Sequence, residues 1–133
     1  MKTRPMLTFD DVEKMAHAAR VEAARNGWAV AIAIVDDGGH LLLLHRFDGV
    51  PPVSSKIAPA KARAAALGKR ETRVYEEMIN QGRTAFLSAP LDGMLEGGVP
   101  IIVDGHVIGA IGVSGVKSSE DAQIAHAGVA ALA

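Results

Sequence analysis

Apolar and polar positions change their spacing along the chain, and these changes predict its elements. After Thr8 and Asp11, which match a helix-capping box, apolar residues recur at helical spacing as far as Gly27, a typical C-terminal cap. A continuous apolar run over 28–35 predicts a buried strand. The run over 40–46 predicts the returning strand of a hairpin.

Helical spacing returns in the second half of the chain. Helices are expected over about 55–67 and 72–81. Pro59 should lie in the first turn of the former, because an interior proline removes a hydrogen bond and clashes with the preceding turn. Residues 85–95 are expected to form a loop with room for a short strand, and 118–132 the last helix.

A glycine-rich hairpin is expected over 96–115, because Asp104-Gly105 stands between two apolar runs and both residues tolerate the positive φ of a tight turn. Five glycines lie on or beside it: Gly97, Gly98, Gly109, Gly112 and Gly115. A glycine in a strand marks a bulge, or the close approach of a ligand, a helix or a partner chain. The hairpin is therefore either the floor of a binding site or a surface for tight helix packing.

This element order predicts a single α+β domain over residues 1–133, in which helices pack on an antiparallel sheet. A net charge of −1 gives no basic surface for nucleic acid. The absence of cysteine excludes disulfides, thiolate metal sites and a cysteine nucleophile. The N-terminus lacks an apolar core of signal-peptide length and no apolar run could span a membrane, so a cytoplasmic protein is expected.

Three segments resemble the HbpS/GlcG-like family of small proteins named for haem degradation. They are Arg46-Phe47-Asp48-Gly49, the helix segment 55–62 and the hairpin segment 97–115. The resemblance implies a profilin-like fold, with about five antiparallel strands, and a homo-oligomer. It also implies mixed activities, since some members bind or degrade haem and others have no agreed chemistry. Ala64 replaces a frequent threonine of the family helix, which weakens the expectation of haem contacts from that helix.

Lys61 is the first candidate for chemistry. It stands among alanines on the predicted 55–67 helix, where a lysine either extends to solvent or becomes partly desolvated. A desolvated lysine can act as a base or hold a carboxylate. Glu96 is the matching candidate for an acid or base, with the backbone of Gly97 and Gly98 against the substrate; a solvated loop glutamate is the alternative.

Arg46, Asp48 and Ser114 complete the predicted substrate site. Arg46 could hold a ligand carboxylate with Asp48 orienting it, or the two could form an ordinary surface ion pair. Ser114 lies between glycines whose N–H groups could form an anion-binding nest, or it simply occupies the turn from strand to helix.

The histidines do not support a metal site. They are His17, His40, His45, His106 and His126, and none is paired at the spacing of a helical zinc site. A haem iron would need an axial ligand, which His45 or His106 could supply, although a lone strand histidine is more often structural.

These residues favour a protein that binds a small carboxylate-bearing metabolite of a catabolic pathway, in a pocket between the 96–115 hairpin and the 55–67 helix. Cofactor-independent acid–base or hydrolytic turnover by Lys61 and Glu96 would extend that binding. The alternatives are haem binding, and a non-catalytic assembly protein whose glycines serve subunit packing. A homo-oligomer, at least a dimer, is expected because the apolar run 125–133 would otherwise be exposed.

Overall fold

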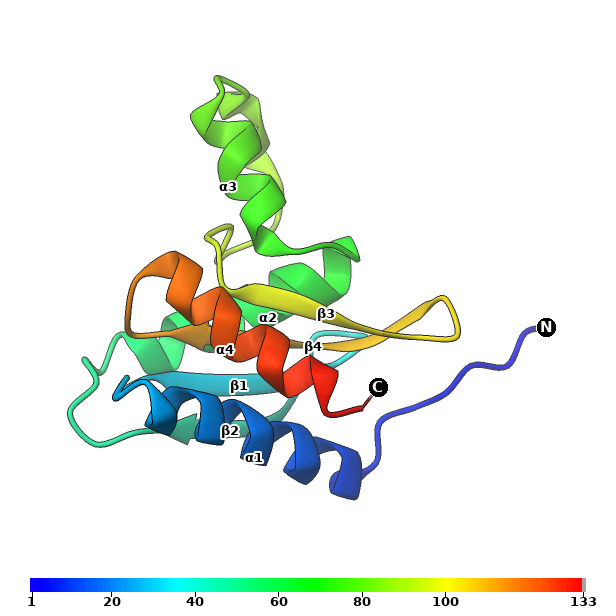
Figure 1. The fold of residues 1–133 in the computed structure, drawn as a ribbon. Helices are drawn as coiled ribbons and strands as arrows, with labels where there is room; N and C mark the ends of the chain where they lie inside the picture. The colour runs from blue at the N-terminus through cyan, green and yellow to red at the C-terminus, as the bar shows by residue number, and fades with distance from the viewer. Residues whose placement is uncertain (133) are drawn as a thin grey trace.

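One antiparallel sheet with helices on both faces forms the body of the protein in the computed structural model, which describes residues 1–132 (Figure 1). The elements in chain order are α1 (Phe9–Arg25), β1 (Ala31–Asp36), β2 (Leu41–Arg46), α2 (Ser54–Gly68), α3 (Thr72–Asn80), the 3-10 helix η1 (Thr84–Ser88), β3 (Gly98–Val103), β4 (His106–Ser114) and α4 (Ser118–Ala130). The predicted α+β class is confirmed. The sheet of the described chain has four strands, not about five, because 85–95 contains η1 and an irregular loop in place of a strand.

The strands lie in the order β2-β1-β4-β3, and every neighbouring pair is antiparallel. The central strands β1 and β4 are therefore flanked on both sides, whereas β2 and β3 each have one edge that no strand of residues 1–132 covers. The β3–β4 hairpin closes at Asp104 and Gly105, whose φ angles of +50° and +77° are those of the tight turn predicted from the sequence.

The capping box predicted at the start of the first helix is also confirmed. The backbone N–H of Asp11 donates to Oγ1 of Thr8 at 3.2 Å, and the N–H of Thr8 donates back to the Asp11 carboxylate at 2.9 Å. These two bonds satisfy groups at the helix N-terminus that have no partner within the helix. The pair fixes the residue at which α1 begins.

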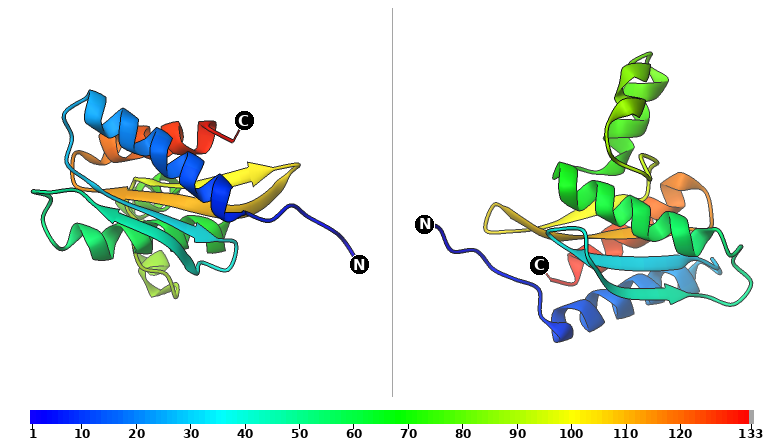
Figure 2. Two further views of the ribbon diagram at one scale, coloured as in Figure 1. Left: turned by 90° about the horizontal axis from the view of Figure 1, so that it is seen from below. Right: turned by 180° about the vertical axis from the view of Figure 1, so that it is seen from behind.

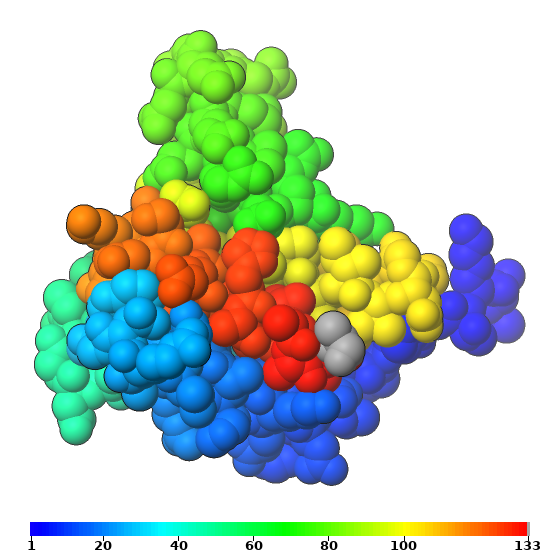
Figure 3. Space-filling view, in the orientation of Figure 1, coloured from blue at the N-terminus to red at the C-terminus, as the bar shows by residue number. Residues whose placement is uncertain are grey.

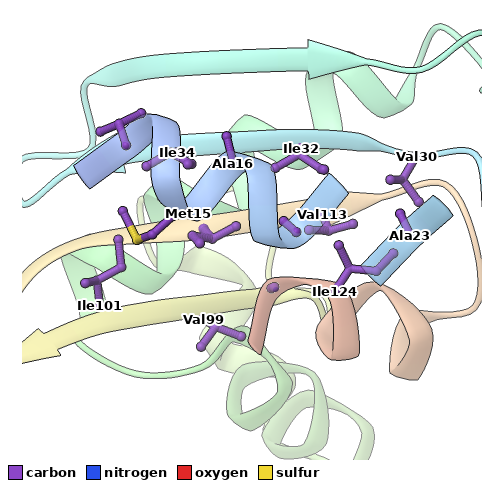
Figure 4. Packing of buried hydrophobic residues seen from close by; sticks show 14 of the residues in the cluster. Met15, Ala16, Ala23, Val30, Ile32, Ile34, Val99, Ile101, Val113 and Ile124 are labelled. Atoms are coloured by element: carbon purple, nitrogen blue, oxygen red, sulfur yellow. The ribbon is translucent and has the colours of Figure 1, made fainter. Parts of the chain in front are cut away.

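The two faces of the sheet are packed differently. Helices α1 and α4 cover one face and α2 covers the other (Figure 2). Figure 4 shows the first layer, filled by large side chains such as Met15, Ile32 and Ile124. The second layer is almost entirely alanine: Ala31, Ala33, Ala58, Ala62, Ala65, Ala66 and Ala110, together with Val35. Because these side chains are small, α2 lies very close to the sheet.

Pro59 lies inside α2, so its predicted place in the first turn is wrong. The helix begins early, because the N–H groups of Ser54 and Ser55 donate to the carbonyl oxygens of Pro51 and Pro52 and form the first tight turns. Pro59 consequently falls in the second turn, where it cannot donate to the carbonyl of Ser55. The helix nevertheless continues to Gly68.

Helix α3, η1 and the loop that follows project from the body as an arm (residues 72–95; Figures 1 and 3). Thr72 fixes the base of the arm: its buried hydroxyl donates to the carbonyl oxygen of Leu95 and accepts the N–H of Gly98 at 2.8 Å. Tyr75 stacks on Phe86, with ring centroids 5.3 Å apart, and joins α3 to η1. Within residues 1–132, no helix is both long and apolar enough to cross a membrane.

Candidate functional site

Lys61 lies in a buried ion pair. Its Nζ donates to the Asp121 carboxylate at 3.1 Å and to the carbonyl oxygen of Val113 at 2.9 Å, and 3% of each charged residue is exposed. The other oxygen of Asp121 accepts the N–H of Val116 at 3.1 Å. Lys61 therefore does not extend to solvent; its ammonium ties α2 to β4 and α4.

Burial raises the pKa of the Asp121 carboxyl above its ordinary value, because the charged form loses its water. The Lys61 ammonium and the Val116 N–H oppose that shift by stabilising the charge. Since every group of this cluster already has a protein partner, the cluster is a structural tie between elements.

The glycines at the start of β3 and on β4 accommodate α2. A Cβ atom on Gly97 would lie 2.7 Å from Nζ of Lys61, and one on Gly98 would collide with the carbonyl oxygen of the same lysine. A Cβ on Gly112 would collide with the carbonyl oxygen of Ala58. Protein atoms thus fill the space between hairpin and helix, where the sequence analysis expected a pocket. Tight helix packing accounts for these glycines.

The other residues predicted from the sequence do not converge on one place. Ser114 is buried, with its Oγ 3.4 Å from Oγ of Ser54. Glu96 is half-buried at the base of the arm. Arg46 and Asp48 are exposed at the end of β2, and they form no ion pair with each other or with any other residue of the described chain.

A cavity of about 410 Å³ opens on another side of α2. Three segments that are distant in sequence enclose it. Helix α2 contributes Pro59, Arg63 and Ala64, the β1–β2 hairpin contributes Gly39 and Leu41, and the loop after η1 contributes residues 90–92. Ala64, the position where the family helix often carries threonine, is one of its apolar walls.

Arg63 and Asp92 supply the charges of this cavity. Both side chains belong to exposed residues, and neither forms an ion pair or a side-chain hydrogen bond within residues 1–132. The stem of Arg63 packs over Gly39, where a Cβ atom would lie 2.8 Å from Cγ of the arginine. Gly39 therefore leaves room for the stem, and the guanidinium is free to bind an anion. Arg63 was not among the site residues predicted from the sequence.

The histidines do not fit an enclosed haem in one chain. His45 pairs with Ile32 in the β1–β2 register, and His106 begins β4; both are half-buried. No histidine of the described chain lines the Arg63 cavity or a second hollow of about 420 Å³ on the arm. Haem iron held in a slot requires an axial donor that faces it. The part of the chain that the structure describes also contains no cluster of three metal-binding side chains.

Comparisons with known proteins agree on a family. The family model described as haem degrading protein HbpS-like matches residues 7–130. Protein GlcG of Escherichia coli strain K12 is 54% identical over 114 residues, which cover 86% of this chain and 85% of GlcG.

Solved structures agree with that match. A double mutant of HbpS from Streptomyces reticuli matches with a TM-score of 0.89 and 31% identity, over 100% of this chain and 91% of that one. The PduOC:haem complex matches with a TM-score of 0.85 and 29% identity, over 96% of this chain and 95% of that one.

Proposed function

This chain belongs to the HbpS-like family. We propose that its function is to bind a small carboxylate-bearing metabolite in the cavity at Arg63. The observation that carries the proposal is an arginine that lines a cavity of about 410 Å³ and has no ion-pair partner among residues 1–132. A guanidinium presents two parallel N–H groups to a carboxylate, which gives both affinity and a fixed orientation.

The rest of the cavity suits such a ligand. Leu41, Pro59 and Ala64 give it apolar walls, which displace water and strengthen a charge-assisted bond. Asp92 offers a carboxylate that can accept a hydrogen bond from a hydroxyl or ammonium group of the ligand. The volume lies within the range of about 300–1,000 Å³ typical of small-molecule sites.

Turnover by Lys61 and Glu96 stays a prediction. In our proposal Lys61 supports α2 through its bonds to Asp121 and Val113, and Arg63 takes the role of carboxylate anchor. Glu96 is not among the residues that line the Arg63 cavity, so any turnover there would use Asp92 as the acid or base. Asp92→Asn tests this step, and Glu96→Gln tests the role predicted from the sequence, because each change removes a base and keeps the size of the side chain.

Titration calorimetry with acetate, butyrate and succinate tests the binding. Arg63→Gln should weaken the best of these ligands about ten- to a hundredfold, which corresponds to a lost charge-assisted hydrogen bond of about 1.5–3 kcal/mol. Arg20→Gln, which changes an exposed arginine of α1, is the matched control and should bind like the parent. Equal affinity of the Arg63 variant and the parent would refute the proposal.

Haem binding is the second candidate, because a relative of similar fold was solved as a haem complex. The cavities described above lack a histidine, so a haem would have to bind at the surface or between chains, near His45 or His106. Titration with haemin separates the two candidates. A Soret shift at one site per chain, lost on replacing either histidine by alanine, would favour haem.

A further inference from the structure

We propose that the ligand held at Arg63 is a monocarboxylate with an apolar tail, and that the tail lies in the groove of the arm. This inference rests on the proposed function and names the class of its ligand. The groove measures about 420 Å³. Its apolar lining comes from Ile79, Leu87, Met94 and Leu95.

The groove and the Arg63 cavity share a wall. Leu91 and Asp92 line both hollows. The loop that carries them lies close against α2 at Gly93. A Cβ atom added to this glycine would lie 2.5 Å from the backbone nitrogen of Lys61. Because they share Leu91 and Asp92, the two hollows lie side by side. A molecule anchored at Arg63 therefore reaches the groove by crossing Leu91.

The lining of the groove is mostly apolar and includes two acidic residues. Leu87 is 63% exposed and Leu95 is 47% exposed, so a tail would cover apolar surface that water now contacts. Glu76 and Asp92 add two carboxylates to the lining. A ligand with a second carboxylate at the far end of its chain would meet like charge there. Glu76, which lines only the groove, thus disfavours a second carboxylate there, whereas Arg63 holds the first one in the neighbouring cavity.

A series of straight-chain monocarboxylates, from acetate through butyrate and hexanoate to octanoate, tests the inference by titration calorimetry. The dissociation constant should fall about fourfold for each methylene that enters the groove. Suberate, which has the length of octanoate and a second carboxylate, should bind more weakly than octanoate. Short acids that bind through Arg63 with no gain from added methylenes would overturn the inference and leave the proposed function intact.

Variants of the groove residues test whether the apolar tail of the ligand lies in the groove. Leu87→Ser should flatten the dependence on chain length and leave the affinity for acetate unchanged, because Leu87 lines only the groove. Leu67→Ser, which changes an exposed leucine of α2 outside both hollows, is the control and should keep the full dependence. Leu95→Ser repeats the test if circular dichroism shows that the first variant is unfolded. An unchanged slope in a folded groove variant would overturn the placement, and failure of every acid to bind would overturn the proposed function as well.

Discussion

The ammonium of Lys61 lies 3.1 Å from the Asp121 carboxylate, where 4% of each side chain is exposed. The two residues come from helices on opposite faces of the sheet, and they meet beside the end of β4. Removing both charges from water costs several kcal/mol for each ion, and the attraction between them offsets that cost only while both partners are present. The pair therefore penalises any arrangement that separates α2 from α4.

Lys61→Ala should destabilise the fold by about 3–5 kcal/mol, because it leaves the Asp121 carboxylate buried without its partner. Urea unfolding followed by circular dichroism measures the loss. The double variant Lys61→Met, Asp121→Leu should recover most of it, since apolar side chains need no partner. A loss below about 1 kcal/mol in the single variant would show that water reaches the carboxylate in solution.

We propose that the chain forms a homo-oligomer through the open edge of β2. The apolar C-terminal run from which assembly was predicted is only partly covered: Ala125 and Gly128 are buried in the chain itself, Val129 and Leu132 are half-buried, and Ala133 lies outside the described residues. Two leucines of β2 outside the Arg63 cavity provide exposed apolar surface: Leu42 and Leu44. An unpaired strand edge with apolar side chains is a template for pairing with another chain.

Light scattering at micromolar concentration checks this proposal. The parent should have at least twice the chain mass of 13.9 kDa, and Leu44→Glu should lower the mass toward that of one chain. Ile102→Glu changes an exposed residue on the opposite edge strand and serves as the control. A parent protein that runs as a monomer would exclude the assembly.

Asp36 makes the β1–β2 turn sensitive to acid. Burial alone would raise the pKa of this carboxyl, but the backbone N–H groups of His40 and Gly38 each donate to it at 2.9 Å, and the net effect lowers the pKa below 3.8. The folded state thus binds this proton less tightly than the unfolded state. The resulting stabilisation is present above the unfolded pKa and is lost as the pH falls through the folded one.

Asp36→Asn keeps an oxygen that can accept both N–H groups but cannot titrate. Its stability should therefore fall less steeply than that of the parent between about pH 4 and pH 2, as measured by urea unfolding at each pH. Asp48→Asn, at an exposed aspartate of the following loop, is the control. Equal acid sensitivity of Asp36→Asn and the parent would remove this carboxyl as the cause.

The sequence predicted what local spacing determines. The Thr8–Asp11 box and the Asp104-Gly105 turn lie within a few residues of their partners, so their types alone indicate the geometry. The helix predicted over about 55–67 is α2. Pro59 was misplaced within it, because the turns at Pro51 and Pro52 extend the helix toward the N-terminus.

The candidate site depended on contacts that spacing cannot reveal. The partner of Lys61 lies 60 residues away on α4, so its burial as an ion pair has no local signal. The cavity at Arg63 is assembled from α2, the β1–β2 hairpin and the loop at Asp92. One signal was present in the sequence: Arg63, two residues from Lys61 on a helix, had to face another surface.

A substitution at Gly39 tests whether the position of the Arg63 side chain matters, because it leaves the charge of Arg63 unchanged. A Cβ atom at Gly39 would lie 2.8 Å from Cγ of Arg63, so Gly39→Ala should displace the arginine stem and weaken carboxylate binding at least severalfold by calorimetry. Gly49→Ala is a matched control, because Gly49 has φ of +83° against +80° at Gly39 and has no atom within 4 Å of the added Cβ. Both variants should lose about 1–2 kcal/mol of stability from backbone strain. Only the Gly39 variant should lose affinity; equal affinities in the two variants would mean that the arginine does not act from its position over Gly39.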